Sequence, residues 1–215
     1  MKLARPDVFH PRIVLAGGPR HPDDAGLVPA LRTRGLHARW LSWDDPDTVG
    51  ADLVILRGAA GIADRRDEFL AWTRRARHLL NPPDALAWNL DERYLRDLAD
   101  AGVPTVRGTG QSALIFVGGQ RSHAWPGEPD FESWDLGYAA VAAAAERAGI
   151  QVGELLYVRA DLAGDRLAGL DLVAPSLGWR RLDADTRGLA QCRFALAVES
   201  ACERLGLGPF SHRRP

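Results

Sequence analysis

Charged residues at alternate positions within residues 155–173 are placed to act together. Arg159 and Asp161 are two positions apart in one predicted strand, and Gly169 and Asp171 are two apart in the next. Successive side chains of a strand point to opposite faces, so a hairpin with an odd number of turn residues puts all four on one face. Mg²⁺ needs only one or two protein carboxylates beside water and a phosphate. The pattern predicts a metal site at Asp161 and Asp171, with a solvated hairpin in which Asp161 pairs with Arg159 as the alternative.

His123 and Arg57 are two further candidates. His123 follows a serine and could bind an acidic substrate or act as a base, or it could only hydrogen-bond a loop. Arg57 follows the apolar run 53–56, at the carboxyl end of a predicted parallel strand, where open α/β sheets bind ligands. Its guanidinium fork suits a small carboxylate. An ion pair with Asp64 or Asp67 is the alternative for Arg57.

Lysine is almost absent, because Lys2 is the only one in 215 residues. A Gly-Lys-Ser/Thr phosphate loop is therefore excluded, and a pyridoxal Schiff base is disfavoured. A GC-rich genome would produce the same preference for arginine without any functional cause. The arginines are dispersed among acids and the formal net charge is −1, so we expect no nucleic-acid partner.

No apolar run approaches the length of a membrane span or of a signal-peptide core. We therefore expect a cytoplasmic protein that does not bind membranes. Cys192 and Cys202 lie ten positions apart in one predicted helix, too far apart for a disulfide.

The first half of the chain alternates strands and helices, as βα units that feed a parallel sheet do. Asp23 and Asp24 are predicted to cap the first helix, and Gly35 to end it. The predicted elements are a strand at 12–16, a helix through Leu27, Val28 and Leu31, strands at 36–41 and 53–56, a helix after Asp64, a turn at 81–83, a helix at 91–100 and a strand at 103–106.

The second half has an α+β pattern. We predict a strand at 113–117, a loop at 125–134, a helix at 138–148, a hairpin within 155–173 and an amphipathic helix at 186–205. The change of pattern places a domain boundary at residues 107–110. The predicted domains are residues 1–106 and 107–215.

Short segments recur along the chain in a fixed order. Among them are Asn89-x-Asp91 followed by Gly102-Val103-Pro104. The other segments are 43–46, 52–57, 65–72, 80–82, 116–119, 122–124, 157–162 and 175–177. Together they resemble the ATP-grasp ligases related to the cyclo-ligase of cycloserine biosynthesis and, more distantly, to glutathione synthetase. Their order and number make the resemblance specific.

The resemblance implies a Rossmann-like domain with a parallel sheet at residues 1–106, followed by a reduced ATP-grasp C-terminal α+β subdomain at 107–215. It also implies ATP and Mg²⁺ as cofactors and phosphorylation of a carboxylate that an amine then attacks. On this basis Arg159 and His123 are the predicted catalytic residues. Asn89 and Arg57 are the predicted cofactor-binding residues.

Four departures from the family pattern concern nucleotide binding. Residues 107–110 fill an interval where the family has several dozen residues that clamp ATP. Glu92 replaces a lysine that contacts ATP in the family, and at about 4 Å this exchange replaces an attraction with a repulsion of roughly 4 kcal/mol. The segment before Pro175 has only Asp171 where the family has glutamates, and the family's lysine after Ser122-His123-Ala124 is missing.

These departures favour a degenerate ATP-grasp protein, non-catalytic, that binds a small carboxylate-bearing molecule or a protein partner. An active ATP- and Mg²⁺-dependent carboxylate–amine ligase is the alternative, with arginines or another chain replacing the lysines. Loss of the clamping subdomain would also expose apolar surface, so we expect a homo-oligomer. A purely structural dimer module is a third possibility.

Overall fold

Four parallel strands form the first sheet, in the order β2–β1–β3–β4. The computed structural model describes residues 9–18, 24–58 and 60–209. The strands are β1 (Ile13–Ala16), β2 (Ala38–Leu41), β3 (Leu53–Leu56) and β4 (Leu79–Leu80). The predicted strands at 12–16, 36–41 and 53–56 are thereby confirmed, whereas the two-residue β4 was not predicted.

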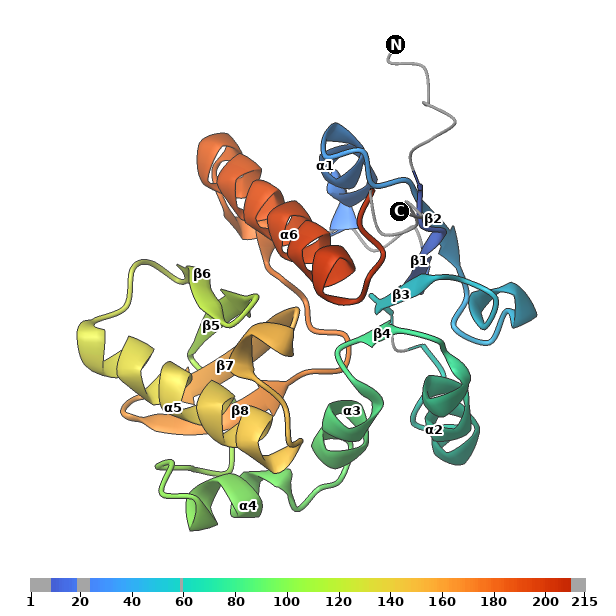
Figure 1. Cartoon of the computed structure of the whole chain (residues 1–215). Helices are drawn as coiled ribbons and strands as arrows, with labels where there is room; N and C mark the ends of the chain where they lie inside the picture. The colour runs from blue at the N-terminus through green and yellow to red at the C-terminus, as the bar shows by residue number, and fades with distance from the viewer. Residues whose placement is uncertain (1–8, 19–23, 59, 210–215) are drawn as a thin grey trace.

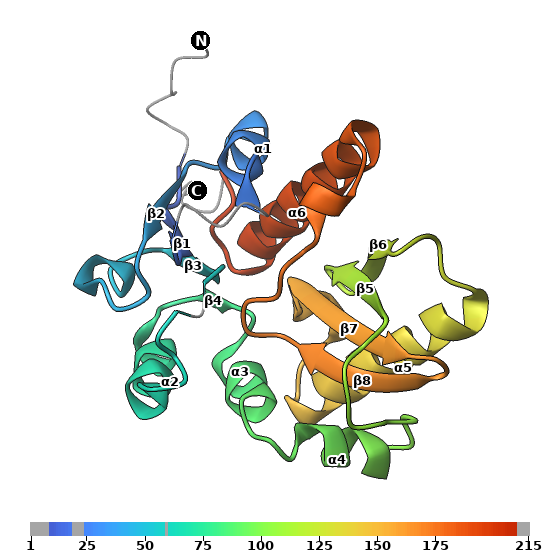
Figure 2. The ribbon, with the colours of Figure 1, turned by 180° about the vertical axis from the view of Figure 1, so that it is seen from behind.

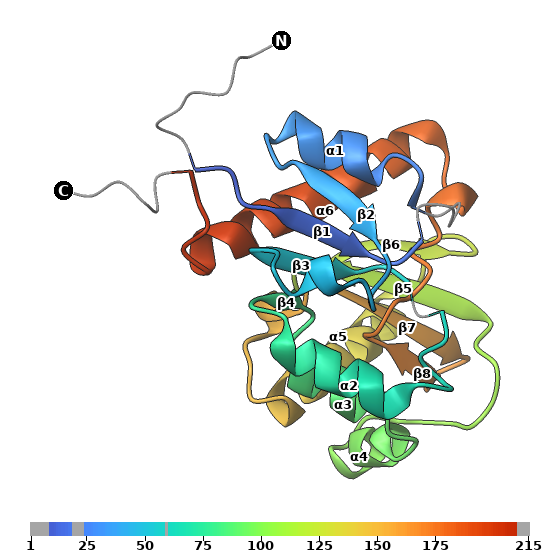
Figure 3. The same cartoon turned by 90° about the vertical axis from the view of Figure 1, so that its right-hand side faces the viewer.

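Helices cover both faces of this sheet (Figure 3). On one face lie α1 (Leu27–Thr33) and the long C-terminal helix α6 (Ala184–Arg204). On the other lie α2 (Arg66–Arg75) and α3 (Pro83–Asn89), whose apolar residues pack with Val14, Val54 and Leu56. Cover on both sides explains why β1 and β3 are continuous apolar runs.

The second sheet is antiparallel, in the order β6–β5–β7–β8. Its strands are β5 (Ser112–Val117), β6 (Gln120–Trp125), β7 (Tyr157–Ala163) and β8 (Arg166–Asp171). One face packs on α5 (Phe131–Arg147), as Figures 1 and 2 show from opposite sides. The mixed α/β fold with one parallel and one antiparallel sheet is the fold class expected from the sequence.

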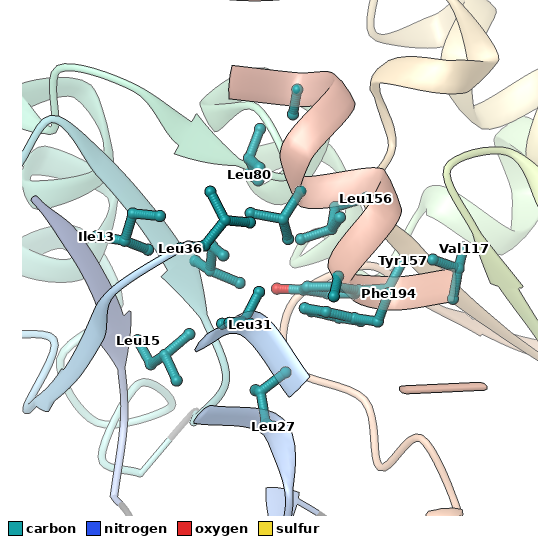
Figure 4. Close-up of a cluster of buried hydrophobic side chains, with 14 of the residues drawn as sticks. Ile13, Leu15, Leu27, Leu31, Leu36, Leu80, Val117, Leu156, Tyr157 and Phe194 are labelled. Carbon is teal, nitrogen blue, oxygen red and sulfur yellow. The ribbon is translucent and has the colours of Figure 1, made fainter. Parts of the chain in front are cut away.

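One hydrophobic cluster is shared by the two halves of the chain (Figure 4). Leu27 and Leu31 of α1 meet Phe194 of α6 and Tyr157 of β7 in a single buried cluster. Phe194 and Tyr157 stack with ring centroids 6.2 Å apart. The boundary at residues 107–110 stays a prediction, because this cluster contains residues from both sides of it.

Three local predictions were wrong. The helix predicted from residue 138 begins at Phe131, because the Asp130 side chain accepts a hydrogen bond from the Ser133 N–H at 2.8 Å and caps it. Strand β6 lies where only a connection was expected, since its alternating polar residues lack a continuous apolar run. Residues 103–106 form a single bridge, Thr105 to Leu167, in place of a strand.

The cap of α1 also differs from the prediction. Gly26 precedes the helix with a positive φ of 92° and gives no side-chain cap. Asp24 is buried and pairs with Arg57, so its carboxylate is committed elsewhere. Asp23 lies outside the described residues.

Two asparagines tie the first half of the chain to the backbone of the second sheet. Asn81 is fully buried, and its Nδ2 donates to the carbonyls of Tyr157 and Leu172, both at 2.8 Å. Its Oδ1 accepts the N–H of Leu156 at 2.7 Å. Asn89 donates to the Leu170 carbonyl at 2.9 Å and accepts the Leu172 N–H at 2.7 Å.

Replacing Asn81 should therefore loosen the contact between the sheets. We expect Asn81→Ala to lower the free energy of unfolding by roughly 3–5 kcal/mol, because it leaves buried backbone groups unpaired. Gln120→Ala, which removes an exposed amide from β6, should change it by less than about 0.5 kcal/mol. Urea unfolding monitored by circular dichroism measures both. Equal effects of the two variants would contradict this account of Asn81.

Candidate functional site

The face of the second sheet opposite α5 carries most of the predicted site residues. Strand pairing sets His123, Ile115, Arg159 and Asp171 in one row across the four strands. The neighbouring row is Trp125, Ala113, Asp161 and Gly169. Residues directly opposite one another on paired strands share a face. The prediction that Arg159, Asp161, Gly169 and Asp171 lie on one face is therefore confirmed.

The reason for this shared face differs from the predicted one. The turn between Ala163 and Arg166 has two residues, an even number. A register shift between Asp161 and Leu162 inserts one extra residue on β8, which restores the alignment. Without this bulge the acids would face opposite sides of the sheet.

Arg159 and Asp161 form an ion pair on this face. The Arg159 Nε and Nη2 atoms lie 2.9 and 2.8 Å from Asp161 Oδ1. Both side chains are about a quarter exposed, at 27% and 26%. The structure thus realises the pairing that the sequence left as the alternative to a metal site, and leaves Arg159 Nη1 available to another acceptor.

Asp171 is more enclosed than Asp161. Its Oδ1 accepts the backbone N–H groups of Val173 at 2.9 Å and Ala174 at 3.3 Å. Burial raises the pKa of the Asp171 carboxyl above its ordinary value, opposed by these two N–H groups and by the charges of Arg159 and Arg57. The described residues contain no group of three or more His, Cys, Asp or Glu placed to hold a metal ion.

Trp125 lies beside the ion pair and contacts two arginines. The guanidinium carbon of Arg159 lies 5.2 Å from the centre of its ring and that of Arg181 lies 5.8 Å from it. Arg181 belongs to the short 3-10 turn η4 (Trp179–Arg181) and is exposed. Gly178, with φ 66°, packs against the same ring, where a Cβ would lie 2.3 Å from Cζ3.

His123 is buried and used within the protein. Its Nε2 lies 2.6 Å from the Leu177 carbonyl oxygen, and its Nδ1 lies 2.9 Å from Ser122 Oγ. A carbonyl can only accept, so Nε2 carries a proton and donates it. The His123 ring thus links the 175–177 segment to β6 by a hydrogen bond. The catalytic role of His123 stays a prediction.

Sequence reasoning missed two neighbours of Asp161. A Cβ on Gly110 would lie 2.7 Å from Asp161 Cβ, so the 107–110 segment passes directly over this side chain. The Tyr94 hydroxyl accepts the Leu170 N–H at 3.3 Å and lies 3.7 Å from where a Gly169 Cβ would be. Burial raises the pKa of Tyr94, with the charges of Asp171 and Asp161 contributing. The glycine in such a short junction was the available signal for a close approach.

Arg57 lies at the carboxyl end of β3, as predicted, and holds a carboxylate of its own chain. Its Nε and Nη2 lie 2.9 and 2.8 Å from Asp24 Oδ1, and Nη2 also donates to the Pro175 carbonyl at 3.1 Å. The side chains of Arg57 and Asp24 are 1% and 0% exposed. Asp64 and Asp67, the partners considered from sequence, are exposed and do not form this pair.

Asn89, the other predicted cofactor-binding residue, is buried beside the β8 backbone. Both polar atoms of its amide are bonded to the β8 backbone, as described above. The structure therefore brings together Arg159, Asp161, Asp171 and His123 on one face of the second sheet. The hydrogen-bonding groups of Asn89 bind the β8 backbone, and Arg57 binds Asp24 and Pro175.

The raised pKa of Asp171 makes stability depend on pH. Because the folded state holds this proton more tightly than the unfolded chain, the contribution of Asp171 is most favourable at low pH and is lost as pH rises through its folded-state pKa. Asp171→Asn keeps an acceptor oxygen without charge. We expect it to raise Tm by a few degrees at pH 7. The gain should vanish below the ordinary aspartate pKa of 3.8. Asp165→Asn, in the exposed hairpin turn, should give no such pH-dependent gain in scanning calorimetry.

Breaking the Arg57–Asp24 pair should be costly. Arg57→Met leaves a buried carboxylate uncompensated, a loss of roughly 3–5 kcal/mol, and should lower Tm by roughly 10 °C. Combining it with Asp24→Asn should recover much of this loss. Arg12→Met, which removes a 72% exposed partner of Asp52, should have a small effect. Additive losses in the double variant would argue against a buried ion pair.

Comparison with known proteins supports the architecture. Residues 12–81 match the family model described as the N-terminal domain of the D-cycloserine synthetase DcsG. The cycloserine biosynthesis protein DcsG of Streptomyces lavendulae is 39% identical over 100 residues. That match covers 42% of this chain and a third (33%) of the length of the relative.

Solved structures extend the likeness to nearly the whole chain. A crystal structure of D-cycloserine synthetase DcsG superposes with a TM-score of 0.73 at 21% identity, covering 90% of this chain and 99% of that one. A RimK domain ATP-grasp protein from Sphaerobacter thermophilus superposes with a TM-score of 0.57 at 15% identity, covering 86% and 99%. At these identities the superpositions establish the fold.

Among the described residues, no helix combines the length and apolar composition that a membrane span requires.

Proposed function

We propose that this chain is a non-catalytic member of the ATP-grasp ligase family and that it binds a small carboxylate-bearing molecule on the face of its second sheet opposite α5. The observation that carries this proposal is the path of residues 107–110. They occupy the place where the family resemblance implies a clamp for ATP, and Gly110 lies against Asp161. The contact with Gly110 leaves little room beside the Asp161 carboxylate for a nucleotide phosphate and its cation.

The remaining groups also favour a small anion over a nucleotide. The side-chain nitrogen and oxygen of Asn89 both hydrogen-bond the backbone, at Leu170 and Leu172. The single lysine, Lys2, lies outside the described residues, so no lysine is available in the described part to bind a triphosphate. Arg159 keeps one amino group free on a face that is partly open to solvent. A guanidinium in such a place suits a carboxylate.

An active ligase is the second candidate, and one observation favours it. Asp161 and Asp171 share a face with Arg159, on neighbouring strands. If Mg²⁺ and ATP bind, these two carboxylates are the residues that would hold the cation, which would neutralise phosphate charge. Asp161 would first have to exchange its bond to Arg159, and Asp171 already accepts two backbone N–H groups.

Self-association is a further part of the proposal. Leu189 and Leu196 of α6 are 63% and 42% exposed, and Phe131 is 81% exposed. Leu189 and Leu196 are seven residues apart on α6 and share one side of this helix, where we propose a contact with a second copy of the chain. Light scattering across a range of protein concentrations measures this part separately from ligand binding.

Thermal shift measurements discriminate between the two candidates. A ligand at 100 times its Kd stabilises by about 2.7 kcal/mol, which raises Tm by several degrees for a chain of this size. We expect no shift with millimolar ATP and Mg²⁺. We expect a shift with small carboxylates that Arg159→Gln abolishes. Arg166→Gln, an exposed arginine of the adjacent strand, should preserve the carboxylate response.

Two outcomes would reject the proposal. A clear shift with Mg²⁺ and ATP that Asp161→Asn removes would support the ligase. The absence of any response to carboxylates, together with a concentration-dependent Tm, would indicate a structural or protein-binding module.

A further inference from the structure

The proposed carboxylate site has a second cationic residue, Arg181, that the sequence did not single out. The indole of Trp125 contacts both Arg159 and Arg181. Their guanidinium carbons lie 5.2 and 5.8 Å from the same ring centre, so the two cations cannot be farther apart than the sum of these distances. The ring therefore gathers two like charges in one small region.

The two cations are balanced unequally. Arg159 is paired with Asp161, whereas Arg181 has no carboxylate within ion-pair distance among the described residues. Asp171, the other nearby acid, is enclosed by its own backbone hydrogen bonds. The charge on Arg181 is thus left for solvent or for a ligand, and a second like charge nearby makes an anion more favourable there.

The position of Arg181 is fixed by packing. Gly178 lies against the Trp125 ring so closely that a Cβ at this position would overlap it. The following turn, η4, begins at Trp179, which is 1% exposed and contacts Phe194 edge to face at 5.8 Å. Arg181 therefore extends from a turn that is anchored in the core on one side and on Trp125 on the other.

We infer that the site takes a ligand with two anionic groups, a small dicarboxylate, whose first carboxylate binds Arg159 and whose second binds Arg181 beside the indole of Trp125. This inference rests on the proposed function, since it requires that Arg159 bind a carboxylate. It adds the class of ligand and assigns Arg181 as the residue that selects it. Trp125 is a positioning residue, because it orients both guanidiniums without contacting the second carboxylate itself.

Calorimetric titration with four simple acids tests the inference. At equal ionic strength, succinate and glutarate should bind about tenfold more tightly than propionate and butyrate, because a second charge-assisted contact forms. Arg181→Gln should remove this preference, and it should weaken the binding of propionate and butyrate much less than that of succinate and glutarate, because only a dicarboxylate reaches Arg181 directly. Arg180→Gln, the neighbouring exposed arginine of η4, is the matched control and should retain the preference.

Trp125 provides a second, independent measurement. Trp125→Phe keeps an aromatic face for the guanidiniums and should preserve most of the preference for dicarboxylates. Trp125→Leu should lose it, with circular dichroism used to verify that both variants are folded. The affinity of the native protein for succinate should also fall more steeply with added sodium chloride than that for propionate.

The outcomes separate this inference from the proposed function. If no acid binds, or if Arg159→Gln leaves binding unchanged, the proposed function fails. If monocarboxylates and dicarboxylates bind equally well and Arg181→Gln has no effect, the inference fails while the proposed function stands. If Arg181→Gln and Arg180→Gln lose the preference for dicarboxylates equally, the preference reflects general surface charge. That result would also overturn the inference.

Discussion

The buried amide of Asn81 is the contact on which the arrangement of the two sheets depends. Asn81 lies just beyond the end of β4. Its side chain hydrogen-bonds three backbone groups of the second half of the chain, the Leu156 N–H and the carbonyls of Tyr157 and Leu172. Such groups cannot remain unpaired away from water. Asn89 repeats this arrangement one helix later, and Tyr157 adds hydrogen bonds to the carbonyls of Leu56 and Val173. This polar connection fixes how β7 and β8 lie against the first sheet, while strand alternation and the β8 bulge set Arg159, Asp161 and Asp171 on one face.

The family resemblance and the structure assign different work to the same residues. Asn89 and Arg57 look like ligand-binding residues from their motifs and strand positions, and in the folded chain both bind other parts of the protein. Arg57 holds a carboxylate, as its position suggested, but the carboxylate is that of Asp24. The proposed carboxylate site lies instead on the second sheet, where Arg159 and Arg181 both contact Trp125.

Much of the fold could be read from local patterns, because apolar runs and caps are short-range signals. Strands β1 and β3 and the hairpin of β7 and β8 were predictable in this way. The helix start at Asp130 and the polar edge strand β6 were not, since burial on one face of β6 is decided by distant α6 and by the 175–181 segment. In the site, alternation predicted the shared face of Arg159, Asp161 and Asp171. No local pattern encodes the β8 bulge opposite Asp161 and Leu162, the approach of Gly110 to Asp161 or the contact of Arg181 with Trp125.

The common core has a consequence for the synthesis of this chain. Helix α6 covers one face of the first sheet, yet its first residue, Ala184, is made long after β3 is complete at Leu56. At the usual speed of translation, that delay amounts to roughly 6–25 s. During this time that side of the sheet lacks the longer of its two covering helices. We therefore expect this apolar surface to stay exposed on the growing polypeptide until α6 has emerged from the ribosome.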